Sequence, residues 1–397
     1  MEEEVRERAF KNILILEAIR RKGPLSKTDI SKLTGINPVT ISNYIERFLE
    51  RNLVLKKELD ISRGGRRPLL LDLNPQAGYA IGVGINLFGV VGVVTDLEGK
   101  IVYSTKFEAE RVSFKDVENF IEKIIEKIIE DNFQIKEKIK GIGIGIGGVI
   151  DKEQGLIKWP EKRDQEYVYV PVPISLKSME RRWNLPVLIE NDATAACFAE
   201  YWLGLPFGVR NVIYMFSGVG VGLILNGELY TGTTGCAGEV SVYNSLEDNL
   251  FNCKFANNCF IKRWEKDLGI LEEVKRRCYK KRINYLKEKK VEDLTLREIF
   301  ELAKEESLIQ EVLEEAGKRL GIKIAFLVNL LNPEIVVIGG GIECAGEVFI
   351  NSVRTTVKAW TFEEINRPLK IVPSFLGEES VALGGASLVV RKVFSKI

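Results

Sequence analysis

The apolar positions of the first fifty residues recur at helical spacing in three short segments. In residues 9–22 they repeat every three or four positions, and the segment ends in basic side chains, which suit the carboxyl end of a helix. Gly23-Pro24 stops this helix. Ser26 can cap a second short helix, which Gly35 closes in a tight turn. The pattern therefore predicts two helices before residue 36.

A third helix is predicted to follow Asn37, with Pro38 at its first position. Its buried stripe is Ile41, Ile45, Phe48 and Leu49. Two short helices around a glycine turn, the second of them amphipathic, are typical of a helix-turn-helix. The opposite face offers small polar groups and a cation suited to base edges and phosphates, and we expect the DNA-binding residues to be Asn37, Pro38, Thr40, Asn43 and Arg47. The alternative is a solvated face in a small helical bundle.

Two apolar triplets, residues 53–55 and 69–71, predict a strand on each side of a basic loop. The loop carries Arg63, Arg66 and Arg67 beside two glycines. Such a hairpin is a wing, and arginines inserted into a narrow minor groove read its width. A solvated basic turn is the alternative, but helices and hairpin together favour a winged helix-turn-helix over residues 1–74, with double-stranded operator DNA as its partner.

After Pro75 the pattern changes to strands and helices in alternation. The expected strands are 79–86, 89–96, 100–104 and 142–148, and the expected long helix is 114–131. The same plan recurs at 212–225 and again at 335–341, where strands run into glycine turns. The body is therefore predicted to be α/β with two similar halves.

One stretch, residues 73–95, carries no charged side chain over 23 positions, which is long enough to cross a bilayer. It contains five glycines and Pro75, and its Val and Ile content favours strands. We interpret it as two buried strands and expect no membrane association. The chain start, MEEEVRERAF, has no signal-peptide pattern, and six scattered Cys argue against a disulfide scaffold, so we expect a cytoplasmic protein.

Composition and charge narrow the chemistry. The 397 residues include no histidine, which excludes imidazole-based catalysis and His-ligated metals. Residues 1–78 hold 15 Lys+Arg and 11 Asp+Glu, a net of +4, whereas the remainder has a net of −3. A basic end on a slightly acidic body indicates an anionic partner at that end.

Several motifs of the body occur together and in a fixed order. They are Glu190-Asn191-Asp192, Phe216-Ser-Gly-Val-Gly-Val-Gly222, Gly235-Cys-Ala-Gly238-Glu239, Asn332-Pro333, Ile338-Gly-Gly-Gly341 and Leu383-Gly384-Gly385-Ala386. In these motifs the chain resembles the ROK family of sugar kinases and sugar-responsive repressors, and the winged helix resembles the repressor branch. The resemblance implies a two-lobed actin-like ATPase (ribonuclease H-like) fold for residues 75–397. Lobe one would be about 75–190 with the C-terminal helix 383–397, and lobe two about 191–382.

The resemblance breaks down where kinases hold ATP. Kinases of the family carry Asp-x-Gly-Gly-Thr, and here the matching run is Gly84-Ile85-Asn86-Leu87-Phe88, which has no carboxylate. Phe216-Ser217 also replace a Gly-Thr pair. Because phosphoryl transfer depends on positioning phosphates and neutralising their charge, we expect no enzyme activity.

The sugar side of the family pattern is better kept. By resemblance Asp192 matches the general base of the kinases, and Asn191 and Glu239 match groups that hydrogen-bond other hydroxyls; we interpret all three as ligands of a carbohydrate effector. Asn191 and Asp192 could instead only cap a helix. The family's Ile-Gly-His is replaced by Val240-Ser241-Val242, and Trp159 is an aromatic candidate for stacking on the sugar, or for packing.

The zinc cluster of the family is reduced to Cys253 and Cys259. Two thiolates do not fill four positions, so we expect no cofactor; a zinc completed by Cys236 or a carboxylate is the alternative.

These observations predict a regulator, a repressor of carbohydrate-utilisation genes, whose degenerate kinase body binds a sugar that changes DNA affinity. Symmetric operators suit two-fold dimers, so we expect a homodimer or a higher oligomer. One alternative is an active ROK sugar kinase that phosphorylates a hexose and carries a DNA-binding arm. Another is a DNA-binding protein whose body binds no ligand and only dimerises.

Overall fold

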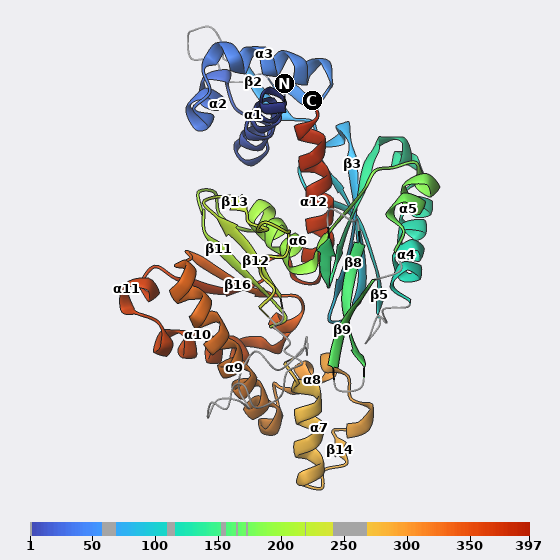
Figure 1. Cartoon of the computed structure of the whole chain (residues 1–397), viewed down its shortest axis with the longest axis vertical. Helices are drawn as coiled ribbons and strands as arrows, with labels where there is room; N and C mark the ends of the chain where they lie inside the picture. Colours follow the sequence, from blue (N-terminus) through green and yellow to red (C-terminus); the bar gives the residue numbers. More distant parts are fainter. Residues whose placement is uncertain are drawn as a thin grey trace.

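The computed structural model describes residues 2–57, 69–108, 116–151, 156–163, 166–171, 174–218, 220–240 and 268–397. An N-terminal domain stands at one end of the molecule, and the body continues away from it as two sheets with helices around them (Figure 1). The N- and C-terminal helices of the chain meet where the two parts join.

The N-terminal domain consists of three helices and a hairpin. The helices are α1 (Glu2–Lys22), α2 (Lys27–Thr34) and α3 (Pro38–Glu50). Strand β1 (Val54–Lys57) pairs antiparallel with β2 (Leu70–Leu73). The winged-helix elements are thus present as expected, although α1 begins at Glu2 and not at residue 9.

Local sequence explains these boundaries. Ser26 and Asp29 form a reciprocal capping box at the start of α2, and Gly35 closes it with φ 72°. The Asn37 side chain accepts a hydrogen bond from the Thr40 amide, and Pro38 occupies the first turn of α3. Ile41, Ile45 and Phe48 are fully buried, but Leu49 is only half-buried and Tyr44 takes the fourth core position.

The first sheet of the body has the order β10-β6-β3-β4-β5. Its strands are β3 (Tyr79–Asn86), β4 (Gly89–Asp96), β5 (Ile101–Glu108), β6 (Ile139–Ile146) and β10 (Val187–Asn191). Every residue of β3 and β4 is buried, so the uncharged run forms two core strands as predicted. No helix in the described parts of the chain is long and apolar enough to cross a membrane.

The second sheet has the order β13-β12-β11-β16-β17. Its strands are β11 (Val212–Phe216), β12 (Gly220–Leu225), β13 (Glu228–Leu229), β16 (Ile335–Gly339) and β17 (Lys370–Pro373). In both sheets an antiparallel meander of three consecutive strands is followed by two parallel strands added at the side where the meander begins. The predicted repetition of one plan in the two halves is confirmed.

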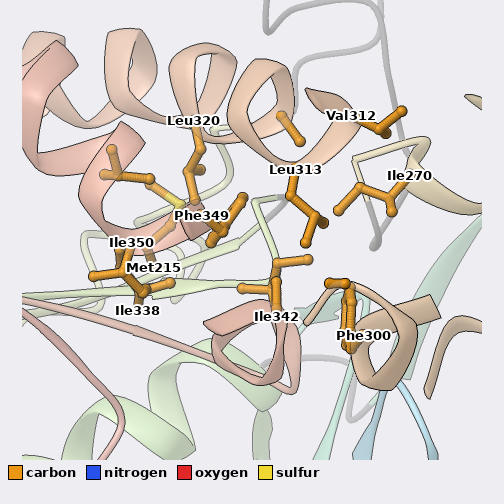
Figure 2. Close-up of a cluster of buried hydrophobic side chains, with 14 of the residues drawn as sticks. Met215, Ile270, Phe300, Val312, Leu313, Leu320, Ile338, Ile342, Phe349 and Ile350 are labelled. Carbon is orange, nitrogen blue, oxygen red and sulfur yellow. The ribbon is translucent and has the colours of Figure 1, made fainter. Parts of the chain in front are cut away.

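Two helices lie between the sheets and others cover the outer faces (Figure 1). Helix α12 (Ser380–Ser395) packs on β3 and β6, and α6 (Asp192–Ala199) packs on β11, β12 and α12. Helix α4 (Val117–Asp131) covers the outer face of the first sheet. Helices α9 (Ser307–Leu331) and α10 (Gly346–Trp360) cover the outer face of the second, where Met215 and Ile338 meet Leu320, Phe349 and Ile350 (Figure 2).

The remaining elements are short. A small sheet consists of β7 (Val149–Asp151), β8 (Leu156–Arg163) and β9 (Glu166–Pro171), and β14 (Tyr285–Leu286) pairs with β15 (Lys289–Lys290). The other helices are α5 (Leu176–Trp183), α7 (Ile270–Lys280), α8 (Leu296–Leu302) and α11 (Glu363–Asn366). The 3-10 turns are η1 (Pro75–Ala77), η2 (Phe133–Lys138), η5 (Val291–Asp293), η6 (Ile342–Ala345) and η7 (Gly377–Glu379), and η3 (Glu200–Gly204) is a π-helical turn.

Candidate functional site

The outward face of α3 carries the predicted polar residues. Asn37, Pro38 and Asn43 are exposed, whereas Thr40 and Arg47 are half-buried. The Arg47 guanidinium lies 4.3 Å from the centre of the Tyr44 ring, which holds its stem against the helix. This face therefore presents hydrogen-bonding groups and an oriented cation on one side of the domain.

Val39 also lies on this face and is 74% exposed. Sequence reasoning missed it because it looked for polar and basic groups on the DNA-facing side of this helix. An exposed methyl group among polar neighbours suits contact with the methyl of thymine.

The hairpin β1–β2 has the antiparallel register expected of a wing, with Val54 opposite Leu73. Lys57 and Asp72 form an ion pair across it. The tip, with Arg63, Arg66 and Arg67, lies outside the described residues.

In the body the predicted ligand residues follow the carboxyl ends of strands. Asn191 ends β10 and Asp192 begins α6, while Gly148 follows β6 in the first sheet. Ligands of open α/β sheets bind at this edge, because loops there lie beyond the ends of several strands at once. The edge is the first place to look for a small-molecule site.

Asn191 acts as the N-cap of α6. Its Oδ1 accepts hydrogen bonds from the amides of Ala193 at 3.0 Å and Thr194 at 3.2 Å. Its Nδ2 donates to the Gly148 carbonyl at 3.2 Å. The capping role that the sequence left as an alternative is therefore present, and Asn191 also ties the start of α6 to the first sheet.

Asp192 and Glu239 form an electrostatically coupled pair of carboxyl groups. Asp192 is 3% exposed, and its Oδ1 accepts from the Ala193 amide at 2.8 Å. Burial raises the pKa of Glu239 to about 7, and the Asp192 carboxylate adds to the rise. A buried carboxylate and a second acid whose pKa it helps to raise are typical of a functional site and costly in a purely structural one.

Trp159 lies in β8, a strand of the small sheet that also contains β7. Its side chain is outside the described residues, so its proposed stacking on a sugar stays a prediction. Strand β7 begins at Val149, directly after the Gly148 carbonyl that holds Asn191.

The run at residues 84–88 is packed into the second half of the body. Phe88 meets Phe300 edge-on with ring centres 6.5 Å apart, and the Arg297 guanidinium lies 4.2 Å from the Phe88 ring centre. Arg297 in turn pairs with Glu378 at 2.9 Å. Leu87 also packs against the core beneath the second sheet.

The glycine turn after β16 approaches the same run. The Leu87 amide donates to the Gly340 carbonyl at 3.4 Å. Gly341 has φ 104°, a conformation that favours glycine, and a Cβ there would also lie tightly against Cβ of Leu87 at 3.0 Å and the Phe88 ring at 3.1 Å. The run 84–88 and the glycine turn thus contact each other directly, with Leu87 and Phe88 half-buried.

The loop after β11 is also closed by internal bonds. Ser217 is fully buried and its hydroxyl donates to the Gly340 carbonyl at 2.8 Å. The Lys323 ammonium, on a side chain only 4% exposed, donates to the Gly218 carbonyl at 2.5 Å. Lys323 was missed in the sequence, although a single lysine within the apolar run Gly321-Ile-Lys-Ile-Ala-Phe-Leu-Val328 signals a buried cation with a partner.

Cys253 and Cys259 lie outside the described residues. Within the described ranges, no group of three or more Cys, Asp or Glu side chains is arranged to hold a metal ion. Cys236 is half-buried and its Sγ lies 3.8 Å from the Thr234 carbonyl oxygen.

Comparisons with known proteins cover both parts of the molecule. Residues 79–392 match the ROK family. The xylose repressor of Bacillus spizizenii is 29% identical over 95% of this chain and 94% of its own. The N-acetylglucosamine repressor of Escherichia coli is 24% identical over 96% of this chain and 93% of its own.

Solved structures show the same fold. A ROK family transcriptional regulator, a homologue of the Escherichia coli MLC protein, superposes with a TM-score of 0.72 at 21% identity and covers 98% of this chain and 97% of its own. A ROK family glucokinase from Streptomyces griseus, solved with glucose and AMPPNP, superposes with a TM-score of 0.60 at 25% identity. It covers 78% of this chain and 99% of its own, which leaves a fifth of this chain without a counterpart in the kinase.

Proposed function

The chain belongs to the ROK family, and from that premise we propose that it is a DNA-binding transcriptional repressor whose body responds to a sugar. The observation that carries the proposal is the similarity to sugar repressors over 95% of the chain, DNA-binding end included. An exposed polar helix on a winged-helix domain supplies the means to bind an operator.

DNA recognition rests on α3 in the major groove. Asn37, Thr40 and Asn43 contact base edges or phosphates, Pro38 sets the start of the helix, and Arg47 contacts the backbone. Arg63, Arg66 and Arg67 of the wing contact the minor groove. The double variant Arg66→Ala with Arg67→Ala then shows weaker DNA binding and a shallower dependence on salt, because fewer counterions are released.

The effector is a small carbohydrate bound by Asp192 and Glu239. Carboxylate oxygens accept hydrogen bonds from sugar hydroxyls, and an ionised acceptor makes the stronger bond. Asn191 orients this pair by fixing the start of α6, and Trp159 supplies an aromatic face. D-xylose and N-acetylglucosamine are the first probes to use, because the similar repressors are named for those sugars.

The body does not phosphorylate its sugar. A nucleotide would have to enter between loops that the packing of Leu87 and Phe88 and the hydrogen bond of Ser217 hold together, and no carboxylate stands at the run 84–88 to organise a metal. The sugar-binding half of a kinase-type cleft is kept and the nucleotide half is converted into core.

The repressor works as a homodimer, since two winged helices on adjacent major grooves match a symmetric operator. It acts on chromosomal DNA and therefore in the cytoplasm. Light scattering of the purified protein, free and on DNA, measures the stoichiometry; a monomer in both states would contradict the dimer.

The test of the function is capture of operator fragments. The purified protein is mixed with sheared genomic DNA of its source at fixed salt, and retained fragments are sequenced with and without each sugar. We expect a small set of fragments upstream of carbohydrate genes whose retention changes with one sugar. Asn43→Ala should lose the enrichment, and the control Asn366→Ala, on α11 of the body, should keep it. Uniform retention of all fragments by the wild-type protein would overturn the proposal.

A further inference from the structure

The N-terminal domain is docked firmly on the body. Asn12, which is fully buried, and Arg8 both donate to the backbone carbonyl of Ile397, at 2.9 and 3.1 Å. Apolar residues of α1 share one core with residues of α6, η3 and α12. A change in the body can therefore reach α1 through direct packing.

Two arginines at the end of α1 bind the turn η3 of the body. The Arg20 guanidinium lies 4.1 Å from the centre of the Trp202 ring and donates to the Trp202 carbonyl at 2.8 Å. Arg21 lies 5.1 Å from the Tyr201 ring and donates to the Tyr201 carbonyl at 3.0 Å. Glu17 pairs with both arginines and holds them side by side.

These contacts have a simple physical reason. Tyr201 and Trp202 belong to η3, the π-helical turn that continues α6. The last carbonyls of a helix have no partner within it, and its carboxyl end attracts cations. Arg20 and Arg21 supply both the donors and the charge from another domain, so α1 caps the helix that α6 begins.

The opposite end of this helix is the candidate effector site. Asn191 caps it and Asp192 is its first residue. With eight residues in α6 and five in η3, the helix spans roughly 20 Å at 1.5 Å per residue. The continuous helix formed by α6 and η3 thus runs from Asp192, the proposed contact of the sugar, to the DNA-binding domain.

The element is tightly enclosed along its length. All eight residues of α6 are buried. A Cβ on Gly384 of α12 would lie 2.1 Å from the Ala195 carbonyl oxygen, and one on Gly222 of β12 would lie 2.3 Å from that of Ala193. Backbones in such close contact cannot absorb a displacement locally, so a shift at one end moves the other.

We propose that residues 192–204 are the lever that carries the effector signal to the DNA-binding domain, with Arg20 and Arg21 as its coupling residues. The proposal rests on the proposed function, in which a sugar contacts Asp192. A sugar that stabilises one position of Asp192 also stabilises one position of Trp202 at the other end of the helix. Because Arg20 binds Trp202, α1 shifts together with Trp202. Because α1 packs on α2 and β2, the orientation of α3 on DNA changes.

The test separates coupling from binding. For the double variant Arg20→Ala with Arg21→Ala, DNA affinity is measured with and without D-xylose or N-acetylglucosamine, and sugar affinity is measured by calorimetry. We expect sugar affinity within about twofold of wild type, while the sugar-induced change in DNA affinity, roughly 5- to 150-fold in allosteric proteins, falls towards one. The control Arg182→Ala removes an arginine that stacks on Trp183 and pairs with Glu122, remote from α1, and should keep the full change.

If sugar still changed the DNA affinity of the double variant as in wild type, the proposed role of residues 192–204 would be wrong. The proposed repressor function would be unaffected. If the double variant does not fold, the same measurement is made on Arg20→Lys, because lysine keeps the positive charge and lacks the planar guanidinium with its several donors. We expect Arg20→Lys to reduce the sugar effect by less than the double variant would. A full effect in Arg20→Lys would overturn the lever.

A second measurement needs no sugar. Coupling is reciprocal, so binding of a captured operator fragment should alter hydrogen–deuterium exchange of the amides of residues 192–204 in the wild-type protein but not in the double variant. If the wild-type protein responds to no sugar, the effector part of the proposed function fails, and this exchange still decides the lever. If DNA does not change the exchange of residues 192–204 in the wild-type protein, the lever is wrong. If the protein binds no DNA at all, both proposals are wrong.

Discussion

The loops at the strand ends of the body fall into a polar half, after β10, and an apolar half, after β3 and β16. In the polar half the chain keeps Asn191 and Asp192, and the Asp192 carboxylate adds to the raised pKa of Glu239. In the apolar half it brings Leu87, Phe88 and a glycine turn into contact, with both side chains half-buried. Under the proposed function, the comparison teaches that one fold can keep the polar groups that would bind a sugar while apolar side chains occupy the loops that would hold a nucleotide.

The largest effect is expected from the polar half. Asp192→Ala removes a proposed acceptor of sugar hydroxyls, and a site built to bind hydroxyl groups loses several orders of magnitude in affinity when such bonds go unmade. We expect sugar binding weakened at least 100-fold by calorimetry, with DNA affinity unchanged. The control Asp131→Ala removes a carboxylate that only accepts from Tyr103 on the outer face. Normal sugar binding by Asp192→Ala would refute the site.

The next effect is a pH dependence of the free energy of unfolding that arises from Glu239 in the polar half. The pKa of Glu239 is raised in the folded protein to about 7 from 4.5, so the folded state binds more protons than the unfolded state between these values. The free energy of unfolding should therefore fall as pH rises from 4.5 to 7, by up to about 3 kcal/mol. Urea unfolding of wild type and Glu239→Gln at several pH values measures it. Equal pH slopes for the two proteins would show that Glu239 does not titrate in this way.

A smaller loss of stability is expected when a side chain of the apolar half is truncated. Phe88→Ala removes the ring that contacts Phe300 and Arg297, and because Phe88 is half-buried the cost should be about 1–3 kcal/mol. Urea unfolding measures this loss, and calorimetry with Mg-ATP should still detect no binding. Phe133→Ala, at an exposed ring, is the control for stability. ATP binding by Phe88→Ala would show that the ring alone closed a working nucleotide site.

The smallest effect concerns one hydrogen bond of the apolar half. Ser217→Ala leaves the Gly340 carbonyl without the Ser217 hydroxyl and should cost about 1 kcal/mol. Sugar binding should stay normal, since Ser217 is not one of the proposed sugar ligands. A sugar affinity reduced as far as in Asp192→Ala would mean that the two halves are one site.

Local patterns in the sequence predicted much of this molecule. Capping residues were enough for α2 and α3, and an uncharged run rich in Val and Ile was enough for β3 and β4, because these elements depend on near neighbours. The repeated plan of the two sheets followed from glycine turns after buried strands. The motif Glu190-Asn191-Asp192 pointed to the polar half through a family resemblance, and its helix cap through residue chemistry alone.

Other features depend on contacts between distant segments. Nothing near Leu87 and Phe88 says that Phe300 and Arg297 lie opposite, although the bulk of the pair showed that the loop was changed. Arg20 and Arg21 looked like ordinary basic residues at a helix end, and their role against Trp202 and Tyr201 appears only when the domains are joined. A long-range partner leaves no periodic signal in a single sequence.

The most direct test of the account is anisotropy of a captured operator fragment, titrated with the protein at one fixed salt concentration with and without sugar. Salt is held constant because it alone shifts DNA affinity by orders of magnitude. The account predicts that one sugar changes the dissociation constant by roughly 5- to 150-fold without ATP. An affinity that no sugar changes, together with sugar-dependent consumption of ATP, would contradict it and identify the chain as a kinase with a DNA-binding arm.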